Sequence, residues 1–450
     1  MVRTNKIEQM IIATVGFFWC FLMWFSTAAF SPTIADEFGL STAQMGLLAS
    51  SALWLAPVGR IIAGWCADRF GAPKTFSVIL IVAGLVSIHS SFVDDYVLLF
   101  IERVIVAASG ISFVVGIQHV AQWFESKEIG TAEGLYAGTG NAGAGVGALV
   151  LPRMYGGDYS SAFLHLGVVA LVIGVIYLMR GVSAKSQEKA ELAKSSANWK
   201  DTIYVWTRYI ALALMLAYAM SFGLEIAMNA WLPGYYSKGF KEAISSLGFS
   251  GIEEIQVAAG TFAAVQSFNA SLFRPFAGYM SDLWQRKGWT PFPLIAKTLP
   301  YSPRLHWLAM ALVLITCGMI ALTIVGTLGL LHASVITLTI FGIFVSFGTG
   351  GVFAVVPLIF KQRPGIATGF IGGVSCTGGI IYPLIYGFGD NIHMGYLYVA
   401  LALFIPFILF YLWAAKWEKN PSAHGIGSPE KWLGEERGKK EVGEEGTKAA

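Results

Sequence analysis

Apolar stretches of about 20 residues recur along almost the whole chain. A helix needs about 20 such residues to cross a hydrocarbon layer of roughly 30 Å, and lipid cannot satisfy the polar groups of an open backbone. With 55% hydrophobic and 13% charged residues among 450, the composition excludes a single water-soluble core. The sequence therefore predicts an all-α membrane protein with twelve spans: 8–30, 43–67, 75–91, 96–123, 129–152, 160–180, 207–232, 256–281, 306–328, 333–359, 364–388 and 394–416.

Basic residues between the spans gather on one side of the predicted membrane. That side holds Arg3, Lys6, Arg69, Lys74, Lys127, the segment 180–208, Arg286, Lys287, Lys297, Arg304, Lys361 and Arg363, whereas the other side holds Arg153, Lys238 and Lys241. The positive-inside rule then places both termini in the cytoplasm, and we expect the protein in the cell (inner, cytoplasmic) membrane. The first span lacks a small-residue cleavage site, so it is interpreted as a retained helix and not as a signal peptide.

The polar segment 181–206, rich in Ser, Ala and Lys, divides the chain into one six-helix bundle over 1–180 and a second over 207–416. The tail 417–450 mixes Glu and Lys, and we expect it to be disordered. The cysteines lie inside predicted spans without paired spacing, which predicts neither a disulfide framework nor a metal site. Because no catalytic or nucleotide-binding motif stands in a plausible context, we expect no enzyme, no cofactor and no nucleic-acid partner.

The chain contains a repeat. The pattern Arg60-x-x-Ala-Gly-x-x-x-Asp68 returns as Arg274-x-x-Ala-Gly-x-x-x-Asp282 at an offset of 214 residues. The glycines of the fifth span return in the eleventh at an offset of 235 residues: Gly130, Gly134, Gly138 and Gly143 correspond to Gly365, Gly369, Gly373 and Gly378. Duplicated six-helix halves are typical of alternating-access transporters, whose substrate sites lie near the bilayer midplane.

Arg60 and Arg274 each lie eight residues from the aspartate of the repeat, or about 12 Å along a helix. Both charges therefore fall near the middle of the membrane, where snorkelling to the headgroups does not reach. A second interpretation is a salt bridge with a membrane carboxylate, but we expect none of Glu102, Glu133 and Glu225 at this depth. The remaining interpretation is that both arginines converge on one small oxyanion, which matches the planar fork of donors.

Asn141 supplies a polar side chain at similar depth in the fifth span, among four closely spaced glycines, Gly138, Gly140, Gly143 and Gly145. Such glycines let helices approach closely and open the backbone to a cavity. Plain helix packing explains the glycines equally well and remains an alternative for Asn141.

The repeated motif resembles the major facilitator superfamily, whose hallmark loop is matched by GWCADRFG at 64–71 and more weakly at 278–287. The resemblance covers all twelve spans. It implies the major facilitator fold, with two pseudo-symmetric six-helix halves, and an alternating-access mechanism. It also implies a gate at the cytoplasmic ends of helices two and eight, formed by Asp68, Arg69 and Asp282.

Two further stretches are similar to the nitrate/nitrite porter family: GTGNAGAG at 138–145 resembles its fifth-helix signature, and SFVVG at 112–116 resembles its fourth helix. In that family two arginines clamp the anion, a tyrosine of helix seven lies in the site, and phenylalanines pack over the planar anion. The resemblance assigns substrate binding to Arg60, Arg274, Asn141, Tyr218, Phe113, Phe347, Gly138 and Gly373.

One position departs from the family pattern, because Cys376 stands where the eleventh helix usually repeats an asparagine. This departure concerns the identity of the anion more than transport itself. We expect a monomeric carrier of nitrate, nitrite or both, driven by protons or by nitrate/nitrite exchange, with Glu102, Glu133 and Glu225 as candidates for carrying protons. The alternatives are an exchanger of small organic anions such as formate or oxalate, and a transporter-like receptor that senses an anion.

Overall fold

The computed structural model describes residues 5–124, 129–183, 208–295, 297, 301–359 and 364–417, and all regular structure in these ranges is helical. Almost all of the predicted linker 181–206 and tail 417–450 lies outside the described residues. The side chain of Asp68 lies outside them as well.

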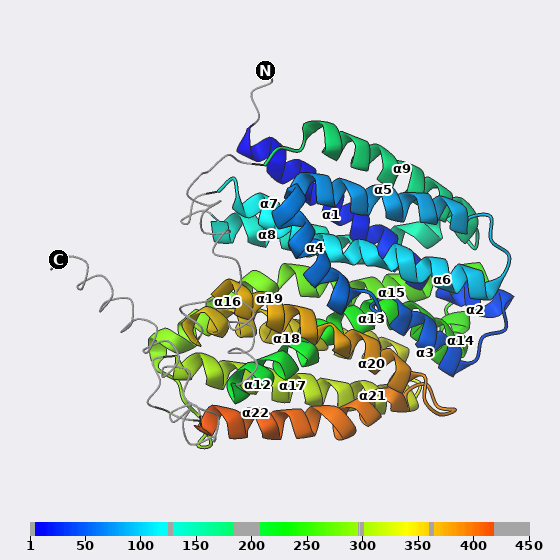
Figure 1. Cartoon of the computed structure of the whole chain (residues 1–450). Coiled ribbons are helices and arrows are strands. Elements are labelled where there is room, and N and C mark those ends of the chain that lie inside the picture. The colour runs from blue at the N-terminus through cyan, green and yellow to red at the C-terminus, as the bar shows by residue number, and fades with distance from the viewer. Residues whose placement is uncertain are drawn as a thin grey trace, which may run out of the picture.

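The first half of the chain forms nine α-helices and a 3-10 turn among its described residues. They are α1 (Lys6–Ala29), α2 (Ser31–Glu37), α3 (Thr42–Ser51), α4 (Ala56–Phe70), α5 (Ala72–Ser90), α6 (Tyr96–Ala107), η1 (Ala108–Ile111), α7 (Ser112–Ala121), α8 (Ile129–Tyr155) and α9 (Tyr159–Arg180). In Figure 1 these blue-to-teal helices form the upper part of the molecule.

The second half forms α12 (Tyr209–Tyr218), the π-helical turn η2 (Ala219–Gly223), α13 (Leu224–Gly239), α14 (Lys241–Ser246), α15 (Ile252–Leu272), α16 (Arg274–Lys287), α17 (Ser302–Thr327), α18 (Leu331–Ile359), α19 (Pro364–Ser375), α20 (Thr377–Tyr386), α21 (Met394–Val399), the π-helical turn η3 (Ala400–Phe404) and α22 (Ile405–Trp417). α13 and α15 pack against α1 and α8 and so join the two halves.

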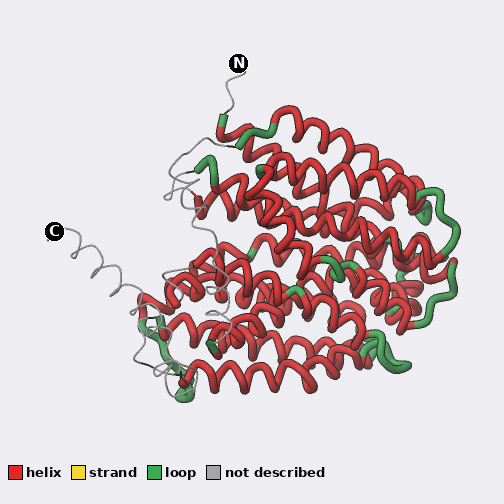
Figure 2. The backbone as a smooth tube through the Cα atoms, viewed as in Figure 1, coloured by secondary structure: helices red, strands yellow, loops and turns green. Residues whose placement is uncertain are grey.

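Helices run between the two ends of the molecule, and the loops gather at these ends (Figure 2). In the described part, ten helical stretches are long and apolar enough to cross a membrane. The two other predicted spans, 129–152 and 256–281, are also helical, as α8 and α15–α16. Glycine in α8 and the Gln, Ser and Asn residues of α15 lower the mean hydropathy of these two helices. This polarity explains why they are not among the ten most apolar stretches.

The two halves touch at one end of the bundle and part at the other. We call the end of the bundle where α1 begins and α22 ends the terminal end, and the opposite one the far end (Figure 1). At the far end, a Cβ on Gly46 would clash with the carbonyl oxygen of Pro383, and one on Gly260 would clash with that of Ala148. Toward the terminal end, such a Cβ on Gly64 or Gly278 would meet no atom of the described residues within 4 Å, apart from its own helix backbone. Among the described residues, the halves therefore meet closely at the far end and leave open space beside these two glycines.

Gln256 ties the halves together at the far end. Its Oε1 accepts hydrogen bonds from the backbone N–H and the hydroxyl of Thr33, at 3.1 and 2.6 Å. Its Nε2 donates to the carbonyl oxygen of Gly156 at 2.8 Å, and the side chain is fully buried. Because Thr33 and Gly156 belong to the first half and Gln256 to the second, these bonds form only while the far end is closed.

We predict that Gln256→Leu opens the far end. Three hydrogen bonds are lost, each contributing about 0.5–1.5 kcal/mol, so the closed state should lose about 2 kcal/mol, or roughly 30-fold in population. Spin labels at the exposed positions Asp94 and Glu242, in a background without the native cysteines, report the distance between the halves. Gln266→Leu is the matched control, since Gln266 lies on the same helix and has no hydrogen-bond partner among the described residues. An unchanged distance distribution in Gln256→Leu contradicts the assignment.

Candidate anion site

Interrupted helices position the predicted site. The second span breaks between α3 and α4, and the eighth breaks at Phe273 between α15 and α16. Each new helix has a proline in its first turn, Pro57 and Pro275. Proline lacks the N–H that would continue the preceding helix, and its fixed φ suits a helix start. Arg60 and Arg274 follow these breaks directly, in the arrangement by which discontinuous helices build transporter sites.

Two further spans are irregular at the same place. The seventh contains the π-helical turn η2 between Tyr218 and Leu224, and the eleventh is interrupted at Cys376. Single π-helical turns within α-helices are frequent at functional sites. The sequence analysis did not predict any of these breaks, although Pro57 and Pro275 are signals for the first two.

Arg60 is buried, with 6% of its surface exposed, and its Nε and Nη2 have no hydrogen-bond partner in the described part of the chain. Its guanidinium carbon lies 5.5 Å from the ring centre of Phe113 and 5.4 Å from that of Phe222. A buried cation between two rings, with free donors, is ready to receive an anion. The sequence analysis assigned Phe113 to the anion site, packing over the planar anion, and did not name Phe222 as a site residue.

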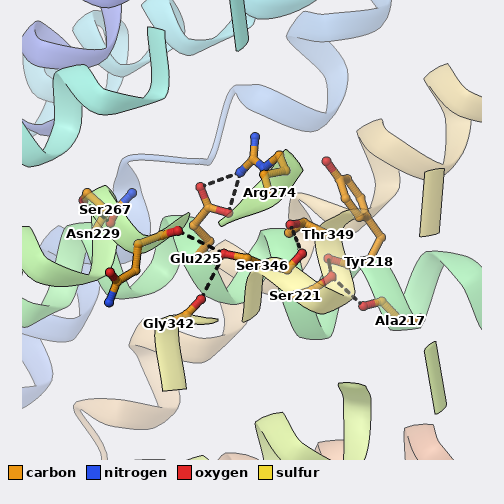
Figure 3. Close-up of polar contacts among 11 residues, drawn as sticks. Ala217, Tyr218, Ser221, Glu225, Asn229, Ser267, Arg274, Gly342, Ser346 and Thr349 are labelled. Atoms are coloured by element: carbon orange, nitrogen blue, oxygen red, sulfur yellow. Dashed lines mark hydrogen bonds and ion pairs between the residues drawn. The ribbon is translucent and has the colours of Figure 1, made fainter. Parts of the chain in front are cut away.

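Arg274 is held by a carboxylate. Its Nη2 donates to both carboxylate oxygens of Glu225, at 2.9 and 2.8 Å (Figure 3). The expectation that no carboxylate reaches the depth of the arginines was wrong for this pair. It rested on the helical rise from Arg208, which neglects the length of both side chains and the wider, shorter winding of the π-helical turn η2.

Tyr218 lies near both arginines, because its ring packs on Phe222, whose ring also faces the guanidinium of Arg60. In Figure 3 it lies on the side of Arg274 opposite Glu225. Its ring stacks on Phe222, with ring centres 5.0 Å apart and an interplanar angle of 9°. Ring contacts thus link Arg60, Phe222 and Tyr218, and Figure 3 shows Tyr218 next to Arg274.

The repeat appears again in the contacts of the predicted glycines. A Cβ on Gly138 would lie 3.9 Å from the carbonyl oxygen of Ser271, and one on Gly373 would lie 4.0 Å from that of Pro57. Pro57 and Ser271 are separated by the same 214 residues as the arginines, and Gly138 and Gly373 by 235. Each glycine therefore meets the backbone of the opposite half, close to a helix break.

Asn141 lies on the same face of α8 as Gly138 and Gly145 by helical spacing, and Gly145 faces Ser267 of α15. It is buried, and neither its Nδ2 nor its Oδ1 has a hydrogen-bond partner among the described residues. Its repeat equivalent, Cys376, is fully buried, and its Sγ lies 3.4 Å from the carbonyl oxygen of Gly372. Unpaired buried amides are rare, so Asn141 is suited to a ligand.

Other predicted residues lie elsewhere. Phe347 packs among Phe276, Trp307 and Phe344, with ring centres 4.9–6.2 Å away. Asp282 pairs with Arg304 at 2.7 Å. These contacts give Phe347 no part in the aromatic pair around Arg60, and they give Asp282 a partner at the start of α17.

The two other glutamates also lie away from the arginines. Glu102 contacts His89 at 2.6 Å, and Glu133 lies half-buried in the first turns of α8. Arg69 is exposed at the end of α4, with its guanidinium carbon 5.3 Å from the ring centre of Trp65. Among the described residues, no group of His, Cys, Asp and Glu could hold a metal ion.

A sequence model of the Major Facilitator Superfamily matches residues 12–383. The chain belongs to this superfamily. A bacterial homologue of the human lysosomal transporter Spinster, solved in an inward-facing, unoccupied conformation, has the same fold, with a TM-score of 0.70 and 14% identity over 92% of this chain and 98% of that one. The predicted major facilitator fold is thereby confirmed.

Two curated relatives are similar over most of their length. One is the nitrate/nitrite transporter NrtP of Nostoc punctiforme, 26% identical over 83% of this chain and 86% of that protein. The other is the probable nitrate/nitrite antiporter NarK1 of Thermus thermophilus, 27% identical over 86% of both proteins.

Proposed function

We propose that this membrane transporter moves nitrate, nitrite or both by alternating access. The observation that carries the proposal is Arg60, a buried guanidinium with free donors between two aromatic rings. The names of the relatives support the same substrate class. Nitrate and nitrite are planar anions with one negative charge, which suits a flat space between rings and a fork of N–H donors.

In the proposed complex the anion lies between Phe113 and Phe222 and accepts hydrogen bonds from Arg60. Asn141 and Tyr218 donate to its remaining oxygens, and Arg274 supplies the second positive charge. Gly138 and Gly373 let the two halves approach closely around it. Phe347 acts indirectly in this arrangement, through its contact with Phe276 beside Arg274.

Both chain termini are proposed to face the cytoplasm of a cell membrane, so that the open terminal end is the inward-facing side of a monomeric carrier. The gate at that end is proposed to use Asp282 with Arg304, and Asp68 with Arg69 in the repeat-related position. Closure there, with opening at Gln256, would expose the anion site to the outside.

Uptake of an anion against an inside-negative potential costs about 2.3 kcal/mol per charge for each 100 mV. The carrier therefore needs cotransported protons or an exchanged anion. Glu102, Glu133 and Glu225 are the candidates for carrying protons, and Glu225 is the one that contacts an arginine of the site.

The test is uptake of labelled nitrate by proteoliposomes, with competition by nitrite, formate and oxalate. Competition by nitrite but not by formate or oxalate supports the proposal. Strong competition by oxalate favours the exchanger of organic anions, and saturable binding without flux favours the anion-sensing receptor.

Asn141→Ala is predicted to raise the half-saturating nitrate concentration by about tenfold, because a buried amide that hydrogen-bonds the anion contributes about 1.5 kcal/mol. Cys376→Ala is the matched control at the repeat-equivalent position, and it should change this concentration by less than about twofold, since a thiol is a weak donor. Near-normal uptake in both variants removes Asn141 from the site.

A further inference from the structure

Glu225 occupies the side of Arg274 that a bound anion needs. Both of its oxygens accept from the same guanidinium nitrogen, while Nε of Arg274 is buried without a hydrogen-bond partner in the described part of the chain. Glu225 is 2% exposed, and the ion pair is closed off from water on its carboxylate side. A carboxylate in this place acts as a built-in competitor of the transported anion.

Among the described residues of the first half, no carboxylate contacts Arg60 as Glu225 contacts Arg274. α1 is the counterpart of α12–α13 in the order of the spans, and its one acidic residue, Glu8, lies in the first turn and pairs with Arg180 at 3.1 Å. Arg60 is therefore free and Arg274 is blocked, although the repeat makes the two positions equivalent. The site therefore combines one arginine that can always bind an anion, Arg60, with a second, Arg274, that can bind it only when Glu225 moves away.

We propose that Glu225 is the proton-binding site of the carrier, and that it takes up one proton for each anion that displaces it from Arg274. The inference rests on the proposed transport of nitrate or nitrite. A carboxylate that loses its cation binds a proton more readily. Anion binding and proton binding therefore favour each other, and by linkage each strengthens the other by the same factor.

The charges around Glu225 are few. Arg274 of α16 contacts it, and Tyr218 of α12 lies beside Arg274 in Figure 3. Tyr218 also stacks on Phe222, whose ring faces the guanidinium of Arg60. Eight other helices of the described part pack on α13. Two of them, α3 and α20, contain no acidic, basic or histidine residue in their described parts. In the described parts of the other six, such residues occur only near the helix ends: α1, α2, α8, α14, α15 and α18. No second carboxylate competes for Arg274.

Counting charges explains how this arrangement couples the two substrates. The empty site holds two arginines and the Glu225 carboxylate, with a net charge of +1. The loaded site holds two arginines, one anion and a neutral Glu225, again with +1. The protonated site without an anion would leave two unpaired arginines to repel each other in a low dielectric, which suppresses a proton leak. Both productive states have the same charge, so transport should respond to a pH gradient and not to membrane potential.

Nitrate binding to the purified full-length protein is the first measurement. We expect the affinity of the unmodified protein to rise between about pH 8 and about pH 5.5 by a factor within the roughly 5–150-fold range of coupled sites. Glu225→Gln, which mimics the neutral form, should bind nitrate as tightly at pH 8 as the unmodified protein does at pH 5.5. Glu254→Gln, a surface carboxylate bonded to Ser250, is the control and should keep the full pH dependence.

Flux in proteoliposomes is the second measurement. The unmodified protein should accumulate nitrate when an inward proton gradient is imposed and should ignore a potassium diffusion potential. Glu225→Gln should lose accumulation but keep exchange of labelled for unlabelled nitrate. Glu225→Asp retains the charge with a shorter reach and should keep pH-dependent accumulation at a weaker level.

The outcomes separate the two proposals. Absence of nitrate binding at every pH overturns the transport proposal. Binding and flux with an unaltered pH dependence in Glu225→Gln, or a pH dependence lost in Glu102→Gln instead, leaves nitrate transport standing and overturns the role of Glu225. Accumulation driven by membrane potential overturns the single proton per anion.

Discussion

Arg60→Lys is expected to lower nitrate affinity about 30-fold or more and to abolish uptake. Lysine keeps the charge but loses the planar fork, and it cannot present two parallel donors to one anion. Loss of a charge-assisted partner of a buried anion costs about 2–5 kcal/mol, and about 1.4 kcal/mol corresponds to tenfold. Calorimetric nitrate binding and proteoliposome uptake measure the effect. Arg180→Lys is the matched control, because Arg180 is an exposed residue paired with Glu8.

The double variant with Arg274→Lys tests whether both arginines hold the same ion. Residues that act on one anion are not additive, so the pair should bind no worse than the weaker single variant. Normal binding and transport by Arg60→Lys, in protein that remains monodisperse on a sizing column, means that Arg60 is structural.

The spans and the repeat follow from patterns along the sequence. Runs of apolar residues predicted a helical membrane protein, and the offset between Arg60 and Arg274 predicted two related halves. These features are local or periodic, so they can be read without knowledge of packing. The repeat-related contacts of Gly138 with Ser271 and of Gly373 with Pro57 show the same symmetry in space.

The partners of the arginines did not follow from the sequence. Glu225 was placed too far from Arg274, because a rise of about 1.5 Å per residue takes no account of side-chain length or of the π-helical turn η2. Phe222, whose ring faces Arg60, was missed, since spacing along one helix does not determine which face meets a residue of the other half. Both errors concern contacts between distant segments, which depend on how helices rotate and cross.

The ion pair also makes a prediction about stability. Arg274→Gln leaves the Glu225 carboxylate, 2% exposed, without its cation. Removal of one partner of a buried ion pair destabilises by about 3–5 kcal/mol, so the variant should unfold at a clearly lower temperature than the unmodified protein. The loss should be smaller at low pH, where a neutral carboxyl group is easier to bury.

Arg274→Gln combined with Glu225→Gln separates folding from binding. With both charges gone, no uncompensated ion remains in the interior, and two amides can hydrogen-bond each other, so thermal stability should return to within about 1 kcal/mol of the unmodified protein. Nitrate uptake should nevertheless stay absent, because Arg60 alone holds the anion and no proton site remains. Unfolding followed by tryptophan fluorescence, together with uptake on the same preparations, measures both effects. If the double variant is as unstable as Arg274→Gln, the destabilisation comes from lost packing of the arginine and not from the stranded carboxylate. If it transports nitrate normally, Arg274 takes no part in binding.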